Sequence, residues 1–247
     1  MNSVRAIVME QAAIRLQKLA PLSATEIDTL LKSAKVCQQV DGGREIFAEG
    51  QQVAAPQILL GGWAYRTRIF HDGRRQIVGF FLPGDLIGMC RHRMPLAQTM
   101  VAALTSVSLC PAPSAVPGSG LSEAYAVSAA LDDAYNLSHI TRLGRMTAYE
   151  RLADWLLEIG YRLDLAGLVN GTSFPLPVTQ EMLADTLGLT SVHVNRTLQA
   201  MRRDGLLELR GGKATLLDRA RLVTLVDWRR PTITAANAQA PLRQGNG

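Results

Sequence analysis

The sequence predicts an α+β fold, in which an N-terminal antiparallel β domain is followed by long helices and a small C-terminal domain of two short helices and a β hairpin. Three observations support this prediction: regular turn signals between residues 40 and 110, a helical stretch without proline from residue 122, and paired amphipathic helices after residue 178. With 247 residues, of which 47% are hydrophobic, the chain has the length and apolar content for two domains.

Residues 40–110 contain short β-type runs that are separated by turn signals. The signals lie about ten residues apart, a spacing typical of an antiparallel β-sandwich or barrel. They are Asp41-Gly42-Gly43, Glu49-Gly50, Gly61-Gly62, Asp72-Gly73 and Pro83-Gly84. The clearest hairpin is predicted at Asp72-Gly73.

The stretch "FFLPGDLIG" predicts a tight corner between two strands. Leu82–Asp85 has the composition of a type II turn, because proline sets the φ of the second position and Gly84 accepts the positive φ of the third. We expect Asp85 to accept backbone hydrogen bonds there rather than to act in catalysis.

The N-terminal residues and the cysteines exclude several classes of protein. The first 20 residues alternate apolar and charged side chains, which indicates a short amphipathic helix rather than a signal peptide, so we expect a cytoplasmic protein. Residues 94–122 carry no charge, but four prolines among them exclude a membrane-spanning helix. Cys37, Cys90 and Cys110 lack metal-type spacing, so reduced thiols are expected, and a redox role for Cys37 or Cys90 stays open.

Residues 122–163 predict two helices that meet between Gly144 and Thr147, since one helix of this length would be unusual. Mostly small residues recur along the first helix, over 122–143 and just beyond, at near-heptad spacing: Ala130, Ala134, Leu137, Thr141 and Gly144. Such a seam allows two helices to approach closely, which favours dimerisation. The stripe is also compatible with packing against the chain's own β domain, and the sequence leaves both interpretations open.

Residues 179–205 predict a helix-turn-helix. Thr179 is placed to cap the first helix, Gly188 to end it, and Thr190 to cap the second helix, which stops at Asp204-Gly205. The expected inward positions are Met182, Leu183 and Leu187 of the first helix, Leu189 of the turn, and Val194, Leu198 and Met201 of the second helix. In such a motif the second helix enters the major groove of DNA.

The segment "GLLELRGGKATLL" follows directly and predicts a wing of two short strands around Gly211-Gly212. Between Ser191 and Arg230 there are nine basic and four acidic residues, an excess equal to the net charge of +5 of the whole chain. A basic surface at this place favours a nucleic-acid partner over the alternative of an amphipathic helix hairpin with a solvated face.

Two motifs, "GRRQIVGFFLPGDLIG" and "LADTLGLTSVHVNRTL", resemble the Crp/Fnr family of bacterial transcription regulators, and the order of elements does so over nearly the whole chain. The resemblance implies a cyclic-nucleotide-binding-type β roll, a double-stranded β-helix of jelly-roll type, as sensor domain over residues 1–121. It also implies a dimerisation helix and a connecting helix over 122–168 and a winged helix-turn-helix over 169–232. The remaining residues, 233–247, are expected to be a disordered tail.

By this resemblance, the chain is a sequence-specific DNA-binding transcription regulator without enzymatic activity. It is expected to bind a pseudo-palindromic operator as a homodimer and to contact RNA polymerase. Whether it activates or represses transcription is left open.

The resemblance also implies which residues contact DNA. Arg196 matches the recognition arginine of the family and is expected to donate two hydrogen bonds to guanine. Val192 stands where the family usually has a glutamate, so it would pack on a thymine methyl group instead of accepting from cytosine. Further base contacts are expected from Ser191, His193 and Asn195. Phosphate contacts are expected from Thr179, Gln180, Thr190, Arg202, Arg203 and Lys213.

The signal that the roll senses is not predicted. Cyclic-AMP sensors of the family carry Gly-Glu and a later Arg-Ser or Arg-Thr. Here Gly88 precedes Met89 and the later segment is "RHRMPLAQT", so cyclic AMP is not expected. Gly88, Arg91 and Arg93 remain the candidate effector residues.

No cofactor or metal site is predicted. Cys110 resembles the roll ligand of the family's iron–sulfur sensors, but no cysteine precedes Cys37, so a four-thiolate cluster is not expected. Haem stays open, with His71, His92 and His139 as available axial ligands. Two alternatives compete with the DNA-binding regulator: a β-roll interaction module that binds no specific DNA, and a cupin-like metalloenzyme, for which the histidines are too few. The basic C-terminal region disfavours both.

Overall fold

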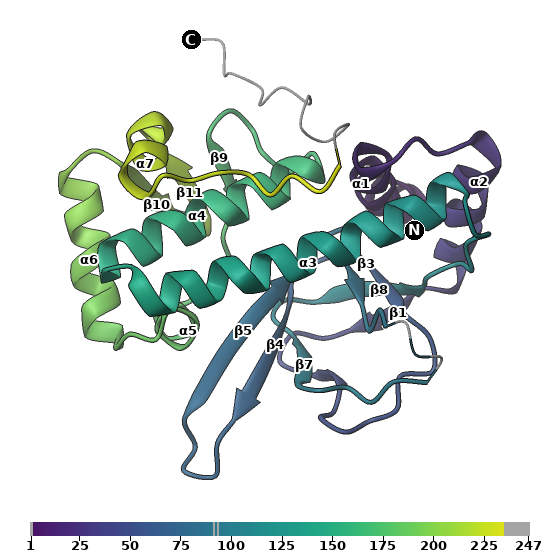
Figure 1. The fold of residues 1–247 in the computed structure, drawn as a ribbon, viewed down its shortest axis with the longest axis horizontal. Coiled ribbons are helices and arrows are strands. Elements are labelled where there is room, and N and C mark those ends of the chain that lie inside the picture. The colour runs from purple at the N-terminus through teal and green to yellow at the C-terminus, as the bar shows by residue number, and fades with distance from the viewer. Residues whose placement is uncertain (1, 91, 93, 235–247) are drawn as a thin grey trace.

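The computed structural model describes residues 2–90, 92 and 94–234 (Figure 1). An antiparallel β roll flanked by the N-terminal helices lies at one end, a long helix crosses the molecule, and a winged helical domain lies at the other end. This arrangement confirms the predicted α+β fold class. Arg91, Arg93 and residues 235–247 of the expected tail lie outside the described residues. Within the described ranges, no helix has both the length and the hydropathy needed to cross a membrane.

The helices are α1 (Asn2–Leu19), α2 (Ala24–Ser33), the 3-10 helix η1 (Ala34–Val36), α3 (Gly120–Arg145), α4 (Ala148–Leu165), α5 (Gln180–Leu187), α6 (Ser191–Arg203) and α7 (Arg219–Val226). The strands of the roll are β1 (Gln38–Val40), β2 (Glu45–Phe47), β3 (Gln57–Gly61), β4 (Ala64–Ile69), β5 (Arg75–Phe81), β6 (Leu86–Ile87), β7 (Met100–Ala103) and β8 (Val107–Pro111). The winged domain adds β9 (Ser173–Pro175), β10 (Leu207–Arg210) and β11 (Lys213–Leu216).

The roll consists of two four-stranded antiparallel sheets, in the orders β1-β8-β3-β6 and β2-β7-β4-β5. Apolar side chains from both sheets form one core cluster, which includes Leu59, Phe81, Ile87, Val101 and Leu109. β4 and β5 form the hairpin predicted at Asp72-Gly73, where Gly73 has a φ of +84°. The antiparallel sandwich that the spacing of the turn signals predicts is therefore confirmed.

The corner between β5 and β6 has the positive φ and the hydrogen bond expected of a type II turn. Gly84 adopts a φ of +89°, and the amide of Asp85 donates to the carbonyl oxygen of Leu82 at 2.9 Å. The Asp85 carboxylate accepts a hydrogen bond from the Leu82 amide at 2.7 Å, as the sequence predicts. The same carboxylate also forms ion pairs with two buried arginines, Arg15 and Arg162, which the sequence pattern did not indicate.

α3 and α4 are separate helices, and the interruption between them, at residues 146–147, lies where the sequence predicts. Thr147 caps α4 in a capping box with Glu150, whose carboxylate accepts a hydrogen bond from the Thr147 amide at 2.8 Å. α3 packs one face against the roll and the N-terminal helices, through Leu121, Ala124, Val127, Leu131 and Tyr135.

The opposite face of α3 is open along its C-terminal half. Leu137 and Ile140 each expose 66% of their surface. Of the predicted seam, Ala130 and Ala134 are half-buried, whereas Leu137, Thr141 and Gly144 are exposed. This half of the stripe therefore does not pack against the chain's own β domain.

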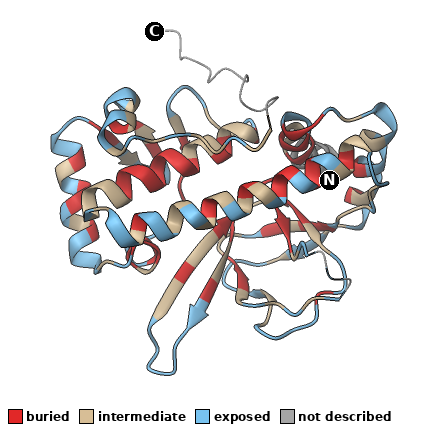
Figure 2. Cartoon of the chain, viewed as in Figure 1, coloured by how far each residue is buried: buried red, intermediate tan, exposed pale blue. Residues whose placement is uncertain are grey.

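α4 is buried along most of its length (Figure 2). Leu152, Trp155 and Ile159 belong to a core cluster that also contains the apolar residues of the winged domain. Phe80 of β5 joins this cluster, and its ring packs edge-on against Trp155 with a centroid distance of 5.6 Å. One core therefore connects the winged domain to the end of the roll.

Candidate DNA-binding surface and its connection to the roll

The helix-turn-helix forms at the predicted residues. The Thr179 hydroxyl accepts a hydrogen bond from the Met182 amide at 3.2 Å, which caps α5. Gly188 ends α5 in the left-handed region, with a φ of +63°. Thr190 then caps α6 by accepting from the His193 amide at 3.2 Å. The caps and the glycine thus set the angle between the two helices.

Apolar packing fixes the rotation of α6 about its axis. Val194, Leu198 and Met201 are buried, and Leu183 and Leu187 of α5 belong to the same core cluster. Because these residues face inward, the opposite face of α6 is turned to solvent (Figure 2). The predicted inward positions of both helices are confirmed, while Leu189 in the turn is partly buried against this core.

Four of the five predicted base-reading residues are exposed on the N-terminal half of α6: Ser191, Val192, His193 and Arg196. Val192 exposes 59% of its surface, although it is apolar. Arg196 forms neither a hydrogen bond nor an ion pair with any residue that the structure describes. Its guanidinium group is therefore available for a ligand outside the chain.

Asn195 differs from the other four because its side chain is engaged within the protein. Its amide nitrogen donates to the side-chain oxygen of Gln180 at 3.0 Å, and its oxygen accepts from the amide of Gln199 at 2.9 Å. The structure thus brings together Gln180 at the start of α5 and Asn195 in α6, which the sequence assigned to different kinds of DNA contact.

The remaining candidates for phosphate contacts are all exposed: Thr179, Thr190, Arg202, Arg203 and Lys213. Thr179 and Thr190 use their hydroxyl oxygens as helix caps, but their hydroxyl hydrogens stay available for donation to a phosphate. Arg202 and Arg203 lie in the last turn of α6, and Lys213 begins β11 of the wing. The candidates therefore come from both helices and from the wing.

The wing is the predicted hairpin, with an additional strand that the sequence reasoning missed. Gly211 and Gly212 make the turn between β10 and β11 with φ values of +58° and +71°. β9 pairs with β11 and completes a three-stranded sheet. Phe174 of β9 is buried in the core beside Gly160 of α4. The only local signal for β9 is the short stretch "SFP", which is too brief to indicate a strand.

A cavity of about 1220 Å³ lies between the roll and α3. Gly88 lines it with a φ of +79°, and a Cβ atom added there would lie 2.7 Å from Val53. Arg91 and Arg93, the other two candidate effector residues, lie outside the described residues. The cavity wall also contains Arg66 and Tyr125, which sequence reasoning did not assign to it.

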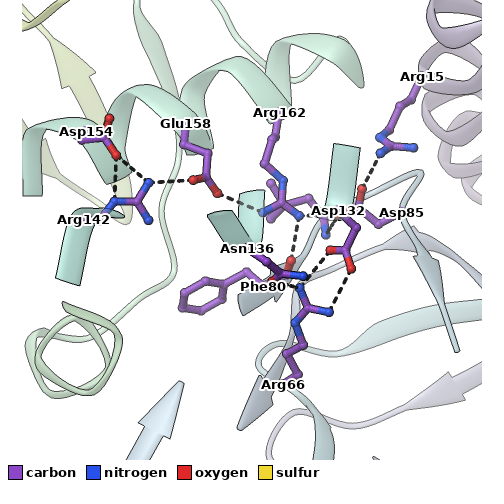
Figure 3. Close-up of polar contacts among 11 residues, drawn as sticks. Arg15, Arg66, Phe80, Asp85, Asp132, Asn136, Arg142, Asp154, Glu158 and Arg162 are labelled. Carbon is purple, nitrogen blue, oxygen red and sulfur yellow. Dashed lines mark hydrogen bonds and ion pairs between the residues drawn. The ribbon is translucent and has the colours of Figure 1, made fainter. Parts of the chain in front are cut away.

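Arg66 connects the roll to α3 across this cavity (Figure 3). Its guanidinium group donates to both carboxylate oxygens of Asp132 at 2.9 Å and to the side-chain oxygen of Asn136 at 2.7 Å. The same group lies 5.4 Å from the centroid of the Phe81 ring. This planar, bidentate contact sets the position of α3 relative to β4.

A second set of ionic contacts runs from the roll corner to α4 and from there to α3 (Figure 3). The carboxylate of Asp85 contacts Arg15 of α1 and Arg162 of α4, each at 2.8 Å. Arg162 also donates to the carbonyl oxygen of Phe80 at 2.7 Å and lies 3.4 Å from Glu158. We call this set, together with Arg142 and Asp154, the ionic chain.

The ionic chain continues along α4 to the C-terminal part of α3. Glu158 pairs with Arg142 at 2.7 Å, and Arg142 pairs with Asp154 at 2.7 Å. The ionic chain contains three arginines and three carboxylates, so the formal charges of this set balance. All six residues are buried: Arg15, Asp85, Arg142, Asp154, Glu158 and Arg162.

The pKa shifts within the ionic chain show which charges are stabilised. Burial alone would raise the pKa of the Asp85 carboxyl, but Arg15 and Arg162 together hold the pKa below its ordinary value. Burial would lower the pKa of Arg162, but Asp85 and Glu158 raise it above the ordinary range. The Asp85–Arg162 contact is therefore ionised on both sides.

A shorter contact joins the roll hairpin directly to the helix-turn-helix. Arg75 of β5 pairs with Asp185 of α5 at 2.6 Å, and the side-chain amide nitrogen of Gln76 donates to the carbonyl oxygen of Thr186 at 3.2 Å. Together with the ionic chain, this contact connects the roll to α5 as well as to α4.

The histidines considered for haem occupy different environments. His71 and His92 are exposed, whereas His139 on α3 is largely buried beside the ionic chain. Burial and the nearby charge of Arg142 lower the pKa of His139 to about 4. Among the described residues, no group of three or more His, Cys, Asp or Glu side chains is arranged to hold a metal ion.

Comparison with known proteins supports the assignment of α5 and α6 to a DNA-binding helix-turn-helix. Residues 150–225 match the family model of the Crp-like helix-turn-helix domain. The chain is 30% identical over 225 residues to the nitrogen fixation regulation protein FixK of Bradyrhizobium diazoefficiens, covering 80% of this chain and 92% of that relative. It is 31% identical over 208 residues to the transcriptional activator protein FnrL of Cereibacter sphaeroides, covering 78% and 81% of the two chains.

A solved structure, FixK2 from Bradyrhizobium japonicum, is similar in fold, with a TM-score of 0.65 and 28% identity over 77% of this chain and 96% of that chain. A regulator of the CRP/FNR family from Thermus thermophilus shares the fold with a TM-score of 0.61 at 21% identity, over 79% and 100% of the two chains. The two sequence relatives, FixK and FnrL, are a nitrogen fixation regulation protein and a transcriptional activator, not enzymes. The chain therefore belongs to the Crp/Fnr family and is a DNA-binding transcription regulator.

Proposed function

We propose that the chain binds a pseudo-palindromic operator as a homodimer and activates transcription from it. The observation that carries this proposal is the exposed N-terminal half of α6, where Arg196 has no partner among the described residues. In a symmetric dimer, two such helices enter successive major grooves about 34 Å apart, so the operator repeats its half-site with inverted symmetry.

The chemistry of α6 specifies parts of each half-site. The guanidinium group of Arg196 donates two hydrogen bonds to O6 and N7 of one guanine. Val192, which is exposed and apolar, packs on a thymine methyl group. Because Asn195 is bonded to Gln180 and Gln199, its role is to hold Gln180 toward a phosphate rather than to read a base.

The exposed stripe on α3 supports the dimer. Leu137 and Ile140 expose apolar surface beside the small residues Thr141 and Gly144, a composition that suits close pairing of two helices. α3 also lines the cavity of the roll, so a ligand that moves α3 would alter the dimer and the spacing of its recognition helices. Activation, with RNA polymerase as partner, is proposed because relatives such as FnrL are named as transcriptional activators.

The first experiment selects binding sites for the full chain from a randomised duplex pool and measures affinity over a series of salt concentrations. We expect an inverted repeat with guanine at the Arg196 contact and a steep fall of log affinity with log salt concentration. Recovery of a single, non-repeated site, or of none, would contradict the proposal.

The dimer has its own test. Leu137→Glu places a charge in the centre of the exposed stripe and should shift the chain from dimer to monomer in sedimentation velocity. Leu225→Glu on α7, where the leucine is 41% exposed, is the matched control and should leave the dimer intact. Equal effects of both substitutions would place the dimer contact elsewhere.

A further inference from the structure

Two cysteines lie at the same end of a pair of neighbouring strands of the roll: Cys37 directly precedes β1, and Cys110 is in β8. β1 and β8 pair antiparallel, with Gln38 opposite Leu109 and Gln39 opposite Ser108. Extending this register by one residue places Cys37 opposite Cys110. Cys37 has an extended backbone, with φ −66° and ψ 138°, so it continues the line of β1 into the end of η1.

The two side chains lie on the same side of the sheet, as opposed residues do. Cys110 is fully buried in the cluster between the sheet and the N-terminal helices, and Cys37 packs against the same cluster. Their sulfur atoms contact consecutive residues: Cys110 Sγ lies 3.7 Å from Ser33 Oγ, and Cys37 Sγ donates to the Ala34 carbonyl oxygen at 2.5 Å. Both thiols therefore converge on the end of α2.

This placement meets the geometric condition for a disulfide. Directly opposed residues of antiparallel strands have Cα atoms about 4.5–5.5 Å apart. Disulfides join Cα atoms that are about 4.4–6.8 Å apart. We propose that Cys37 and Cys110 are a redox modification site, at which a peroxide forms an intramolecular disulfide that ties the end of η1 to β8.

The reaction balances with one peroxide molecule for each disulfide. The thiolate of half-buried Cys37 attacks one peroxide oxygen and the O–O bond breaks. The product is a sulfenic acid on Cys37, and the departing oxygen takes up the proton that Cys37 released. The Cys110 sulfur then attacks the Cys37 sulfur, the S–O bond breaks, and water leaves with the Cys110 proton. Two thiols are oxidised, and hydrogen peroxide is reduced to water.

The environments of the two thiols assign their order of reaction. Cys37 retains contact with solvent, whereas Cys110 is fully buried. Burial raises the pKa of the Cys110 thiol to about 11, so Cys110 is a poor first nucleophile at neutral pH. Cys110 therefore acts as the resolving thiol, and its step should become faster at higher pH.

Cys90 provides an internal comparison. It is exposed in the segment after β6, and it is remote in sequence from the β1–β8 ladder. Oxidation controlled by exposure alone would favour Cys90, whereas oxidation controlled by proximity would favour the Cys37–Cys110 pair.

The test treats the full chain with hydrogen peroxide, unfolds it in denaturant and blocks the remaining thiols with N-ethylmaleimide, and identifies crosslinked peptides by mass spectrometry without reduction. We expect an intramolecular Cys37–Cys110 crosslink, loss of two of the three free thiols, and recovery of both with dithiothreitol. The Cys90→Ser variant should form the same crosslink. The Cys37→Ser variant, which keeps buried Cys110 and replaces only a half-buried side chain at the edge of the cluster, should not form it.

Two results would overturn the proposal. One is that Cys37 and Cys110 both remain alkylatable at a peroxide concentration that oxidises Cys90. The other is that the crosslinks formed involve Cys90 or join two chains. Circular dichroism of each variant checks that it is folded, so that a missing crosslink reports the chemistry of the pair.

Discussion

Two arginines of this chain show how environment decides the role of one type of side chain. Arg196 is exposed on α6 and has no partner among the described residues. Arg162 is 6% exposed and contacts Asp85, Glu158 and the Phe80 carbonyl oxygen. An unpaired surface guanidinium group can form new hydrogen bonds with a guanine, whereas a buried and paired one holds its neighbours in place.

Arg196→Ala should weaken binding to the selected operator about 10- to 100-fold, because a bidentate arginine–guanine contact contributes about 1–3 kcal/mol. Discrimination at the contacted guanine should also be lost. The matched control is Arg229→Ala, which removes an exposed arginine that pairs with Asp227 beyond α7. Fluorescence anisotropy on operators with each base at the contacted position measures both effects. A uniform loss at every base would make Arg196 a phosphate contact.

His139 should make stability depend on pH. Its pKa is about 4 in the folded chain because of burial and Arg142, against an ordinary value of 6.5, while Glu158 acts in the opposite direction. Between these two values the unfolded chain binds a proton that the folded chain does not, so the free energy of unfolding falls as the pH is lowered from 6.5 to 4. We expect the free energy of unfolding to fall by about 2 kcal/mol over this range. This is less than the whole pKa difference would give, because the His139 ring is not wholly buried.

The measurement compares urea unfolding of the wild type and of His139→Gln at pH 7 and pH 5. The carboxylates of the chain affect both proteins alike, so the difference between the two slopes isolates the histidine. Identical pH dependence in the two proteins would show that His139 is not protonated more readily in the unfolded chain.

At the scale of elements, the helix-turn-helix depends on caps and on one left-handed residue. Thr179 and Thr190 begin the two helices, and Gly188 turns the chain between them. A Cβ atom at Gly188 would lie 3.3 Å from Leu143 of α3, so this turn also packs against α3. The angle between α5 and α6 is therefore set both locally and by α3.

Gly188→Ala should lower the free energy of unfolding by about 1–2 kcal/mol, because the left-handed region is unfavourable for a residue with a Cβ atom. Gly205→Ala is the matched control: its φ of +68° is similar, but nothing lies within 4 Å of the added atom. We expect Gly188→Ala to be the more destabilising variant in chemical unfolding and to weaken DNA binding in addition. Equal losses of unfolding free energy in the two variants would mean that the Leu143 side chain moves aside without lowering stability.

At the scale of the whole molecule, buried charges join the roll to α3 and α4, and a partly exposed ion pair joins it to the winged domain. The ionic chain connects α1, the corner before β6, α4 and α3 (Figure 3). The Arg75–Asp185 pair adds a contact from β5 to α5. A change in the roll that moved Asp85 would therefore displace Arg162 and α4. The roll is thereby in contact with α4, the helix whose apolar face packs in one core with the winged domain.

Arg162→Met should destabilise the chain by about 3–5 kcal/mol, because it leaves buried carboxylates with fewer positive partners. Arg229→Met, in an exposed pair whose side chains are 82% and 81% accessible, should change stability by less than about 1 kcal/mol. Thermal and urea unfolding of both variants measure the difference. A loss for Arg162→Met no greater than that for Arg229→Met would show that the ionic chain relaxes without cost.

The sequence by itself determined the features that depend on neighbouring residues. The strand-forming turns, the type II corner, the break before α4, both helix caps and the wing hairpin all lie where the sequence predicts them. The physical reason is that periodic apolar positions, capping side chains and glycines with positive φ act within a few residues of the chain. The same local pattern placed Arg196 on the exposed face of α6.

Only the tertiary structure decided the contacts between residues that are distant in sequence. Asp85 meets Arg15 and Arg162, Asn195 bonds to Gln180, β9 completes the sheet of the wing, and the strand that follows Cys37 pairs with the strand that contains Cys110. No periodic pattern marks these partners, because each pairing depends on how sheets and helices pack together. Local sequence therefore predicts the DNA-reading element, whereas packing determines how that element is joined to the roll.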